Sequence, residues 1–289
     1  MIRVFFYIGI ASLVFSGCST DIPTPPSFEE QLKKDVAIID AYLASNSINA
    51  TVDPSGVRYL VTVVGTGEKL ESTETAYVSV LGKVLTTGVV FFDTKGSYVA
   101  SPLGDPNNLE CLRIVLPLVT KGSSLTIYSP SGLAYGGGSS ADGTLPPNAN
   151  VSFEMQLFDE VAQFKLDTAA ISAYVEANNI NAIKDASGLQ YVITEPGTGA
   201  KPIASSTVTF NYEGKLLATG VVFDKSTTVP LTLLLTNVIK GLQIGFPLLS
   251  VGAKATFYIP SSLGYGPPRN SSIPGNSSLI FEIELVSVR

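Results

Sequence analysis

Asp224 and Tyr265 are side chains near the carboxyl end of the sequence that packing alone explains poorly. Asp224 directly follows the apolar run GVVF (residues 220–223), and Tyr265 stands between two glycines in LGYG (residues 263–266). A carboxylate in an apolar strand must reach solvent or accept hydrogen bonds, and glycine neighbours leave little for a tyrosine ring to pack on. The aromatic residues around them would, taken alone, indicate a sheet core. Asp224 and Tyr265 instead favour a binding site with a polar edge.

The composition limits the chemistry that such a site could perform. The chain has no histidine, so the commonest general base and the commonest transition-metal ligand are both missing. It has no tryptophan either. Metal and catalytic-triad chemistry are therefore close to excluded, and no cofactor is expected. Charged residues are only 15% of the chain, the net charge is −6, and no basic patch interleaved with aromatic residues is visible. Nucleic acid is not an expected partner.

One helix followed by strands and turns is expected to position the site. Asp167 can cap a helix that continues to about Asn178, with Ile171 and Val175 on its apolar face. Three later segments alternate apolar and polar residues as strands do, namely 207–217, 254–260 and 278–288. The segment 238–252 has helical spacing and can lie across the sheet. The loop 266–278 is rich in Pro, Gly and Ser, and loops of this length inside a domain are usually functional.

The same arrangement occurs twice in the chain. AYVEANNINAIKDASGLQYVI (residues 173–193) resembles AYLASNSINATVDPSGVRYLV (residues 41–61), an offset of 132 residues. This period is far longer than a solenoid or propeller repeat, so each copy is expected to be a complete domain. We expect domain 1 at residues 28–162 and domain 2 at residues 163–289, each beginning with an amphipathic helix.

The N-terminus has the pattern of an export signal. Arg3 precedes an apolar run, and small residues lead to Cys18. We expect a signal peptide at 1–17 and a proline-rich tether at 18–27. The segment FSGC resembles a bacterial lipobox, in which the cysteine carries the lipid. By the same resemblance, Ser19 favours the outer membrane of a Gram-negative bacterium, on either its periplasmic or its surface face. Ordinary secretion with an incidental cysteine is the alternative. The remaining cysteine, Cys111, is expected to be a small buried hydrophobic residue.

Six segments of the second copy occur in the order and spacing of a known family. NYEGKLL, GVVFD, VIKG, PLLSVGAKATFYIP, LGYG and IPGNSSLIFEIEL make residues 201–289 resemble the FKBP-type peptidyl-prolyl cis-trans isomerases. The resemblance implies an α+β fold, two tandem FKBP-like domains, each a twisted antiparallel half-barrel sheet wrapped around a short helix. The catalytic residues it implies are Tyr212, Phe223, Asp224, Ile239 and Tyr265, and the substrate-binding residues are Leu231, Val238, Leu242, Ile273 and Phe281. Leu242 replaces the usual tryptophan floor.

The implied reaction needs no proton transfer. Rotation about an X-Pro amide has a barrier of about 20 kcal/mol because resonance is lost in the twisted state. An apolar pocket disfavours the planar, charge-separated amide more than the twisted one. By resemblance, the Tyr265 hydroxyl and the Ile239 main-chain N–H hold substrate carbonyls, and Tyr212 and Asp224 form the polar edge. The missing histidine is then no objection.

The first copy departs from this pattern. Val80 stands where the second copy has Tyr212, a second phenylalanine is inserted before Asp93, and NLEC (residues 108–111) replaces VIKG. We expect domain 1 to keep the fold with a poor or absent site, serving either as a spacer or as a groove for unfolded chain.

Two functions follow from the resemblance. The first is a lipid-anchored isomerase of the cell envelope that assists the folding of proline-containing extracytoplasmic polypeptides, with catalysis in domain 2 and macrolides as further ligands. The alternative is a non-catalytic polypeptide-binding chaperone or assembly factor, motivated by Leu242 and the altered first copy.

Overall fold

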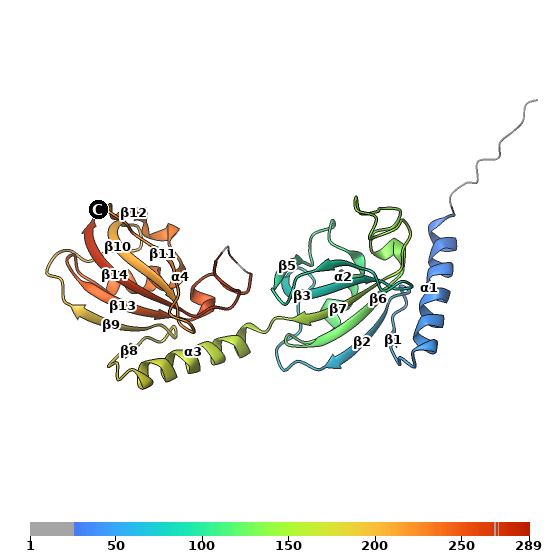
Figure 1. The fold of residues 1–289 in the computed structure, drawn as a ribbon, viewed down its shortest axis with the longest axis horizontal. Coiled ribbons are helices and arrows are strands. Elements are labelled where there is room, and N and C mark those ends of the chain that lie inside the picture. The colour runs from blue at the N-terminus through green and yellow to red at the C-terminus, as the bar shows by residue number, and fades with distance from the viewer. Residues whose placement is uncertain (1–25, 269, 271) are drawn as a thin grey trace, which may run out of the picture.

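The computed structural model describes residues 26–268, 270 and 272–289. It contains two similar domains side by side, with the long helix α3 (Glu160–Ala177) beneath the second (Figure 1). The predicted signal peptide, Cys18 and most of the predicted tether lie outside the described residues. No helix in the described ranges combines the length and the apolar character needed to cross a membrane.

Each domain is built on one antiparallel sheet. In domain 1 the strand order is β1-β2-β6-β7-β3-β4, with β5 paired to β3. In domain 2 the order is β11-β10-β14-β13-β9-β8, with β12 paired to β10. The predicted α+β class with two such domains is confirmed.

The strands of domain 1 are β1 (Thr51–Val52), β2 (Arg58–Val63), β3 (Thr75–Val84), β4 (Val90–Asp93), β5 (Val99–Pro102), β6 (Ser124–Ser129) and β7 (Val151–Leu157). The strands of domain 2 are β8 (Ile183–Lys184), β9 (Gln190–Glu195), β10 (Thr207–Leu216), β11 (Val222–Lys225), β12 (Leu231–Leu234), β13 (Lys254–Ile259) and β14 (Leu279–Val288). The short helices are α2 (Glu110–Val115), η1 (Leu116–Leu118) and η2 (Ser131–Leu133), and in domain 2 η3 (Leu235–Asn237), α4 (Lys240–Gly245), η4 (Phe246–Leu248) and η5 (Ser261–Leu263).

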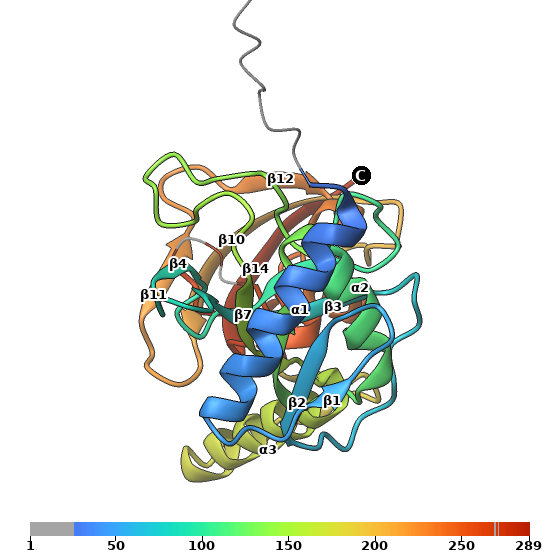
Figure 2. The same ribbon diagram turned by 90° about the vertical axis from the view of Figure 1, so that its right-hand side faces the viewer.

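A long helix precedes each sheet. α1 (Phe28–Ser45) runs along the outside of domain 1 (Figure 2) and starts with a capping box between Ser27 and Glu30. α3 starts at Glu160, with Asp159 as its N-cap. The prediction that Asp167 caps this helix is wrong, because Asp167 lies inside the helix and is only 3% exposed. The predicted boundary between residues 162 and 163 falls within α3.

The short helix of each domain lies over the sheet with matched side-chain volumes. In domain 2, Phe257 is fully buried under α4, and a Cβ on Gly245 would lie 2.7 Å from its ring. In domain 1 the sheet position is Ile127 and the helix position is Val115. Domain 2 thus pairs a large sheet residue with a small helix residue, whereas domain 1 pairs two residues of intermediate size. Both combinations keep the interior close-packed.

Cys111 lies on α2 and is fully buried. Burial raises the pKa of its thiol to about 12. It is the only cysteine among the described residues, and it acts as a small apolar core residue.

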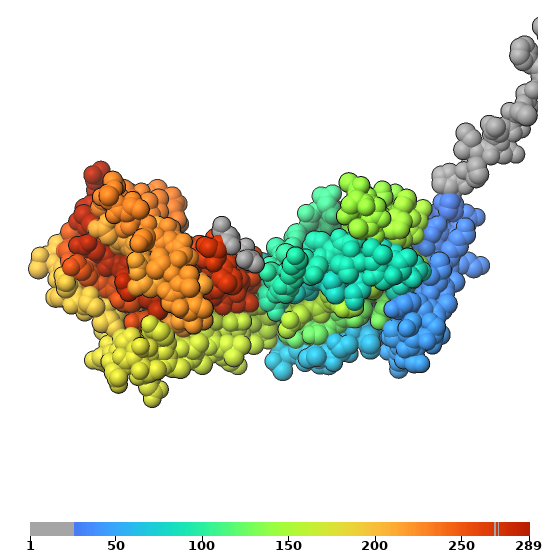
Figure 3. Space-filling view, in the orientation of Figure 1, coloured from blue at the N-terminus to red at the C-terminus, as the bar shows by residue number. Residues whose placement is uncertain are grey.

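α3 connects the two domains and contacts both of them. At its start, Lys121 of domain 1 forms an ion pair with Glu160 at 2.6 Å. Further along, Ile171 and Val175 pack against Tyr258 and Ile280 of domain 2. The space-filling view shows the resulting two lobes with a broad hollow between them (Figure 3).

Candidate functional site

A cavity of about 260 Å³ opens in domain 2 between the sheet and α4. β10, β11, β12, α4, the loop after η5 and β14 all contribute to its wall. The lining residues are Phe210, Tyr212, Asp224, Leu231, Leu233, Asn237, Val238, Ile239, Leu242, Tyr265 and Phe281. The cavity is thus mostly apolar, with a few polar groups at its edge, as is usual for sites that bind small or extended ligands.

Most of the predicted site residues meet in this cavity. Of the predicted residues, only Phe223 and Ile273 are not part of its lining. Ile273 is 5% exposed and belongs to the core of domain 2. Phe210, Leu233 and Asn237 also line the cavity, although none of them is among the predicted site residues. Phe210 alternates with Tyr212 on β10, a pattern that equally indicates sheet core.

The polar edge of the cavity is a hydrogen bond between two strands. The Tyr212 hydroxyl on β10 donates to the Asp224 carboxylate on β11 at 2.7 Å. Burial, followed by this hydrogen bond, raises the pKa of Tyr212 to about 12. Burial also raises the pKa of Tyr265. Both phenols therefore stay protonated through the neutral range and can donate hydrogen bonds.

Phe223 supports this edge from behind the cavity wall. Its ring makes edge contacts with Tyr265, at a centroid distance of 6.3 Å, and with Phe281, at 5.7 Å. The backbone of Gly214 makes room for it, because a Cβ there would lie 2.6 Å from the Phe223 ring. Phe223 therefore positions two lining residues without lining the cavity itself.

Ile239 brings a main-chain donor to the cavity. It is the N-cap of α4, with φ −59° and ψ 153°, so its N–H precedes the first turn of the helix. Within the described residues this N–H has no hydrogen-bond acceptor. The Gln243 side chain donates to the Val238 carbonyl at 2.8 Å and fixes the approach to the helix. The cavity thus offers one main-chain donor and the Tyr265 hydroxyl, because the Tyr212 hydroxyl already donates to Asp224.

The family profile described as FKBP-type peptidyl-prolyl cis-trans isomerase matches residues 66–158 and again residues 199–286, together more than half of the chain. The chain belongs to this family. Both domains are FKBP domains, and the predicted family is confirmed.

Named relatives cover only part of the chain. The probable FKBP-type peptidyl-prolyl cis-trans isomerase FkpA of Neisseria meningitidis is 44% identical over 116 residues, which are 37% of this chain and 42% of that protein. The outer membrane protein MIP of Legionella longbeachae is 42% identical over 106 residues, which are 36% of this chain and 45% of that protein. The chain spans about half or less of the length of both relatives.

Solved structures give matches of similar extent. The peptidyl-prolyl cis-trans isomerase from Pseudomonas syringae pv. tomato is 31% identical, with a TM-score of 0.40 over 45% of this chain and 96% of that one. FkpA from Escherichia coli is 33% identical, with a TM-score of 0.39 over 45% of this chain and 64% of that one.

The corresponding place in FKBP domain 1 differs at the polar edge. On β3 and β4, Phe92 pairs with Gly82, as Asp224 pairs with Gly214 in domain 2. Phe92 therefore replaces the aspartate, and the apparent insertion before Asp93 is a substitution. Asp93 lies one position further along and accepts a hydrogen bond from the Lys95 N–H at 2.6 Å. Val80 replaces Tyr212 and is 7% exposed.

The main-chain donor of domain 1 is already occupied. Leu109 is the N-cap of α2, as Ile239 is of α4. Its N–H donates to the Asn108 side-chain oxygen at 2.9 Å, and the Asn108 amide donates to Ser101 and to the Pro102 carbonyl. The aromatic cluster is kept, because Phe91 makes edge contacts with Tyr135 and Phe153. Domain 1 thus retains the aromatic frame, including Tyr135 in the place of Tyr265, but has neither the Tyr212–Asp224 pair nor a free main-chain donor.

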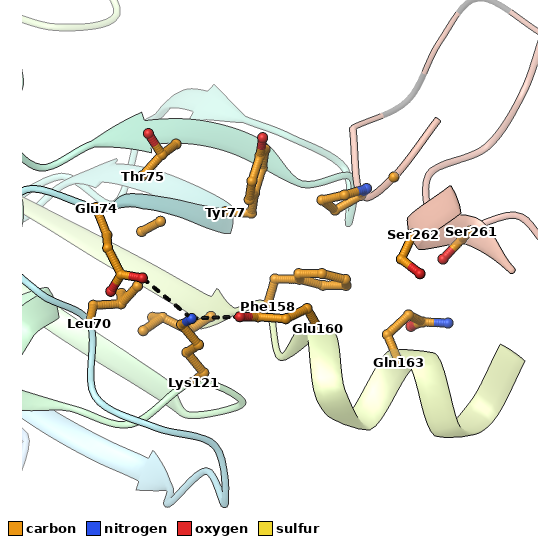
Figure 4. Close-up of a pocket in the computed structure, with 14 residues that line it drawn as sticks. Leu70, Glu74, Thr75, Tyr77, Lys121, Phe158, Glu160, Gln163, Ser261 and Ser262 are labelled. Carbon is orange, nitrogen blue, oxygen red and sulfur yellow. Dashed lines mark hydrogen bonds and ion pairs between the residues drawn. The ribbon is translucent and has the colours of Figure 1, made fainter. Parts of the chain in front are cut away.

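Another cavity, of about 340 Å³, lies between the two domains (Figure 4). Tyr77, Lys121 and Phe158 line it from the side of domain 1, and Ser261, Ser262 and Pro267 line it from domain 2. None of the predicted site residues lines this cavity. The charged groups at one end of this cavity pair with each other, because Glu160 forms a hydrogen-bonded ion pair with Lys121 and raises the pKa of that lysine.

Proposed function

We propose that domain 2 is a peptidyl-prolyl cis-trans isomerase whose site is the cavity of about 260 Å³ lined by Tyr212, Ile239 and Tyr265. The observation that carries the proposal is the Ile239 N–H, which has no hydrogen-bond partner among the described residues and lies at an apolar cavity together with the Tyr265 hydroxyl. The names of similar proteins, which include FKBP-type peptidyl-prolyl cis-trans isomerases called FkpA, support the same activity.

The proposed mechanism uses exclusion of water and fixed hydrogen-bond donors. A proline ring enters among Leu242, Phe281 and their apolar neighbours, where the planar, charge-separated amide loses more solvation than the twisted one. The Ile239 N–H and the Tyr265 hydroxyl donate to carbonyl groups of the substrate. These bonds hold the chain on both sides while the X-Pro amide rotates through its barrier of about 20 kcal/mol. Tyr212, bonded to Asp224, keeps the edge of the pocket in place.

Leu242 gives this pocket a less bulky floor than an indole would. Its side chain is 3% exposed and belongs to the core of domain 2. A leucine offers no N–H and less contact area than tryptophan, so a proline ring is held less tightly. Substrate selection then depends more on the residues that flank the proline, including Leu231 and Val238.

Domain 1 is proposed to be catalytically inactive. Its aromatic frame is intact, but Val80 and Phe92 replace the polar edge, and Asn108 occupies the donor that a substrate carbonyl would need. A buried donor that already has a partner gains little from a new one.

The proposed substrates are proline-containing polypeptides outside the cytoplasm. The name of the Legionella relative, an outer membrane protein, supports a place in the cell envelope. We further propose a lipid anchor at Cys18, which lies outside the described residues, and macrolides as ligands of the domain 2 cavity. The proposed domain boundaries remain residues 28–162 and 163–289.

The test is a peptide isomerisation assay on the full chain. The chain should accelerate exchange of an Ala-Leu-Pro-Phe peptide above the uncatalysed rate. Tyr265→Phe should lower kcat/KM about three- to tenfold, since one hydrogen bond contributes about 0.5–1.5 kcal/mol and 1.36 kcal/mol is a factor of ten in rate. Tyr135→Phe, the matched change in domain 1, should leave the rate unchanged.

A full chain with no rate above background would overturn the proposal. The alternative, a non-catalytic polypeptide-binding protein, predicts suppression of aggregation that survives Tyr265→Phe. Equal losses from Tyr265→Phe and Tyr135→Phe would instead contradict the assignment of catalysis to domain 2.

The rate should not depend on pH across the neutral range. The chain has no histidine, and the pKa of Tyr212 is raised from 10.0 to about 12. A raised phenol pKa means that the donating form is fully present below pH 10 and is lost as the pH rises towards 12. A profile of kcat/KM from about pH 6 to 9 should therefore be flat. A bell-shaped profile centred near neutrality would show that a titrating group takes part.

A further inference from the structure

A buried carboxylate on α3 is connected to the loop that carries Tyr265. Asp167 is 3% exposed, and one of its oxygens accepts hydrogen bonds from the Ser261 N–H at 2.8 Å and from the Ser261 hydroxyl. Its other oxygen accepts from the Gln163 side chain at 2.8 Å. Figure 4 shows Gln163 on α3, below Ser261 and Ser262 of η5. A buried charge costs several kcal/mol unless it is hydrogen-bonded, and both oxygens are satisfied here.

Ser261 passes this constraint to the residues that flank Tyr265. Its carbonyl accepts hydrogen bonds from the Gly264 N–H at 3.0 Å and from the Gly266 N–H at 2.9 Å. The N–H groups of the two residues that flank Tyr265 are therefore tied to one carbonyl. Glycine is needed at position 266, where φ is +73°. Such a turn has little stiffness of its own, so its position depends on how Ser261 is held.

We propose that Asp167 is a positioning residue for the reaction of domain 2, acting through Ser261 to place the Tyr265 hydroxyl in the cavity. This inference rests on the proposed isomerase function. Asp167 does not touch the substrate. It fixes the start of η5, whose N–H would otherwise be buried without an acceptor, and thereby the direction from which Tyr265 approaches the bound chain.

Domain 1 supplies a matched control within the same chain. Asp35 on α1 is 1% exposed and accepts from the Ser131 N–H at 2.9 Å and from the Ser131 hydroxyl at 2.6 Å. The Ser131 carbonyl accepts from the Ala134 and Gly136 N–H groups, which flank Tyr135. Asp35→Ala therefore removes the same two hydrogen bonds around a tyrosine that we propose to be inactive, and leaves the Ser131 N–H its longer bond to Asn150 at 3.2 Å.

The first measurement is kcat/KM of the full chain. Asp167→Ala should lower it about three- to tenfold, approaching the loss caused by Tyr265→Phe, because a shift of about 1 Å in a positioning group costs large factors in rate. Asp35→Ala should leave it within about twofold, which is the usual range for distant independent sites. Asp167→Asn should recover most of the rate, since the Gln163 amide can turn its oxygen towards the new NH₂ and leave the asparagine oxygen for Ser261.

The second measurement is a double-mutant cycle. In a Tyr265→Phe background, Asp167→Ala should change kcat/KM less than about twofold, because the hydroxyl that it positions is gone. An unreduced effect in this background would show that Asp167 acts on something other than Tyr265 and would overturn the proposal. Ser261→Ala, which removes only the hydroxyl donor, is a milder variant and keeps the test available should Asp167→Ala fail to fold.

Amide hydrogen exchange gives a readout that does not depend on activity. Asp167→Ala should accelerate exchange of the Gly264 and Gly266 amides and leave Ala134 and Gly136 unchanged, and Asp35→Ala should do the reverse. If the wild-type chain shows no isomerase activity but the exchange pattern is as expected, the proposed function fails while the connection to Tyr265 stands. If the chain is active and Asp167→Ala has no more effect on its rate than Asp35→Ala, the positioning role is wrong.

Discussion

Ile239→Pro is expected to lower kcat/KM of the full chain at least about tenfold while leaving domain 2 folded, because proline removes the main-chain donor together with part of the apolar wall. The backbone can accept this change. Ile239 has φ −59°, within the range that proline fixes, and Val238 has φ −96° and ψ 167°, as the residue before a proline requires. The Ile239 N–H has no recorded partner in the described chain, so the helix loses no hydrogen bond.

Leu109→Pro is the matched control for this experiment. Leu109 also has a compatible φ, −58°, at the N-cap of α2, but its N–H is bonded to Asn108. This variant should keep the full isomerase rate. Circular dichroism of both variants should match the wild-type chain. Full activity of a folded Ile239→Pro variant would rule out the donor role of this N–H.

Phe257→Ala is expected to destabilise domain 2 by about 3–5 kcal/mol, the usual cost of removing a phenylalanine ring from a core. Phe257 is fully buried under α4, the helix that begins at the cavity. Urea unfolding followed by tyrosine fluorescence should show domain 2 unfolding earlier, with the transition of domain 1 unchanged.

Domain 1 indicates which second substitution should compensate for a change at the contact between α4 and the sheet of domain 2. Gly245→Val alone should destabilise domain 2, since even a Cβ would lie 2.7 Å from the Phe257 ring. Phe257→Ile alone leaves a cavity. The double variant copies Val115 and Ile127 of domain 1, so its loss of stability should be smaller than the sum of the single losses. Additive losses would show that the two positions do not share one packing constraint.

Local pattern predicted much of the fold and the residue types of the site. The alternation of Leu279, Phe281 and Ile283 is that of β14, and the apolar face of Ile171 and Val175 packs on the sheet as expected. The end of α3 is also as predicted, with Asn178 as its C-cap. These features depend on periodicity, which a single sequence contains.

Features that depend on contacts between distant segments could not be predicted in the same way. Asp167 has the side chain of a helix cap, but its partner is Ser261, 94 residues away, so nothing local distinguishes a cap from a buried anchor. Phe92 looks like an insertion until the pairing of β3 with β4 places it opposite Gly82. The bond between Asn108 and its neighbour's N–H depends on a side-chain rotamer, and no sequence pattern encodes it.

The uninterrupted course of α3 has a geometric consequence for the length of the chain between the domains. An α-helix turns by about 100° and advances about 1.5 Å for each residue. A single residue added between Glu160, which is ion-paired to domain 1, and Asp167, which is anchored in domain 2, would therefore turn the cavity of domain 2 by roughly a quarter of a circle around the helix axis. About four added residues would bring it nearly back into line, one helical turn further from its neighbour. The spacing between these two acidic residues thus sets the direction in which the cavity of domain 2 faces relative to domain 1.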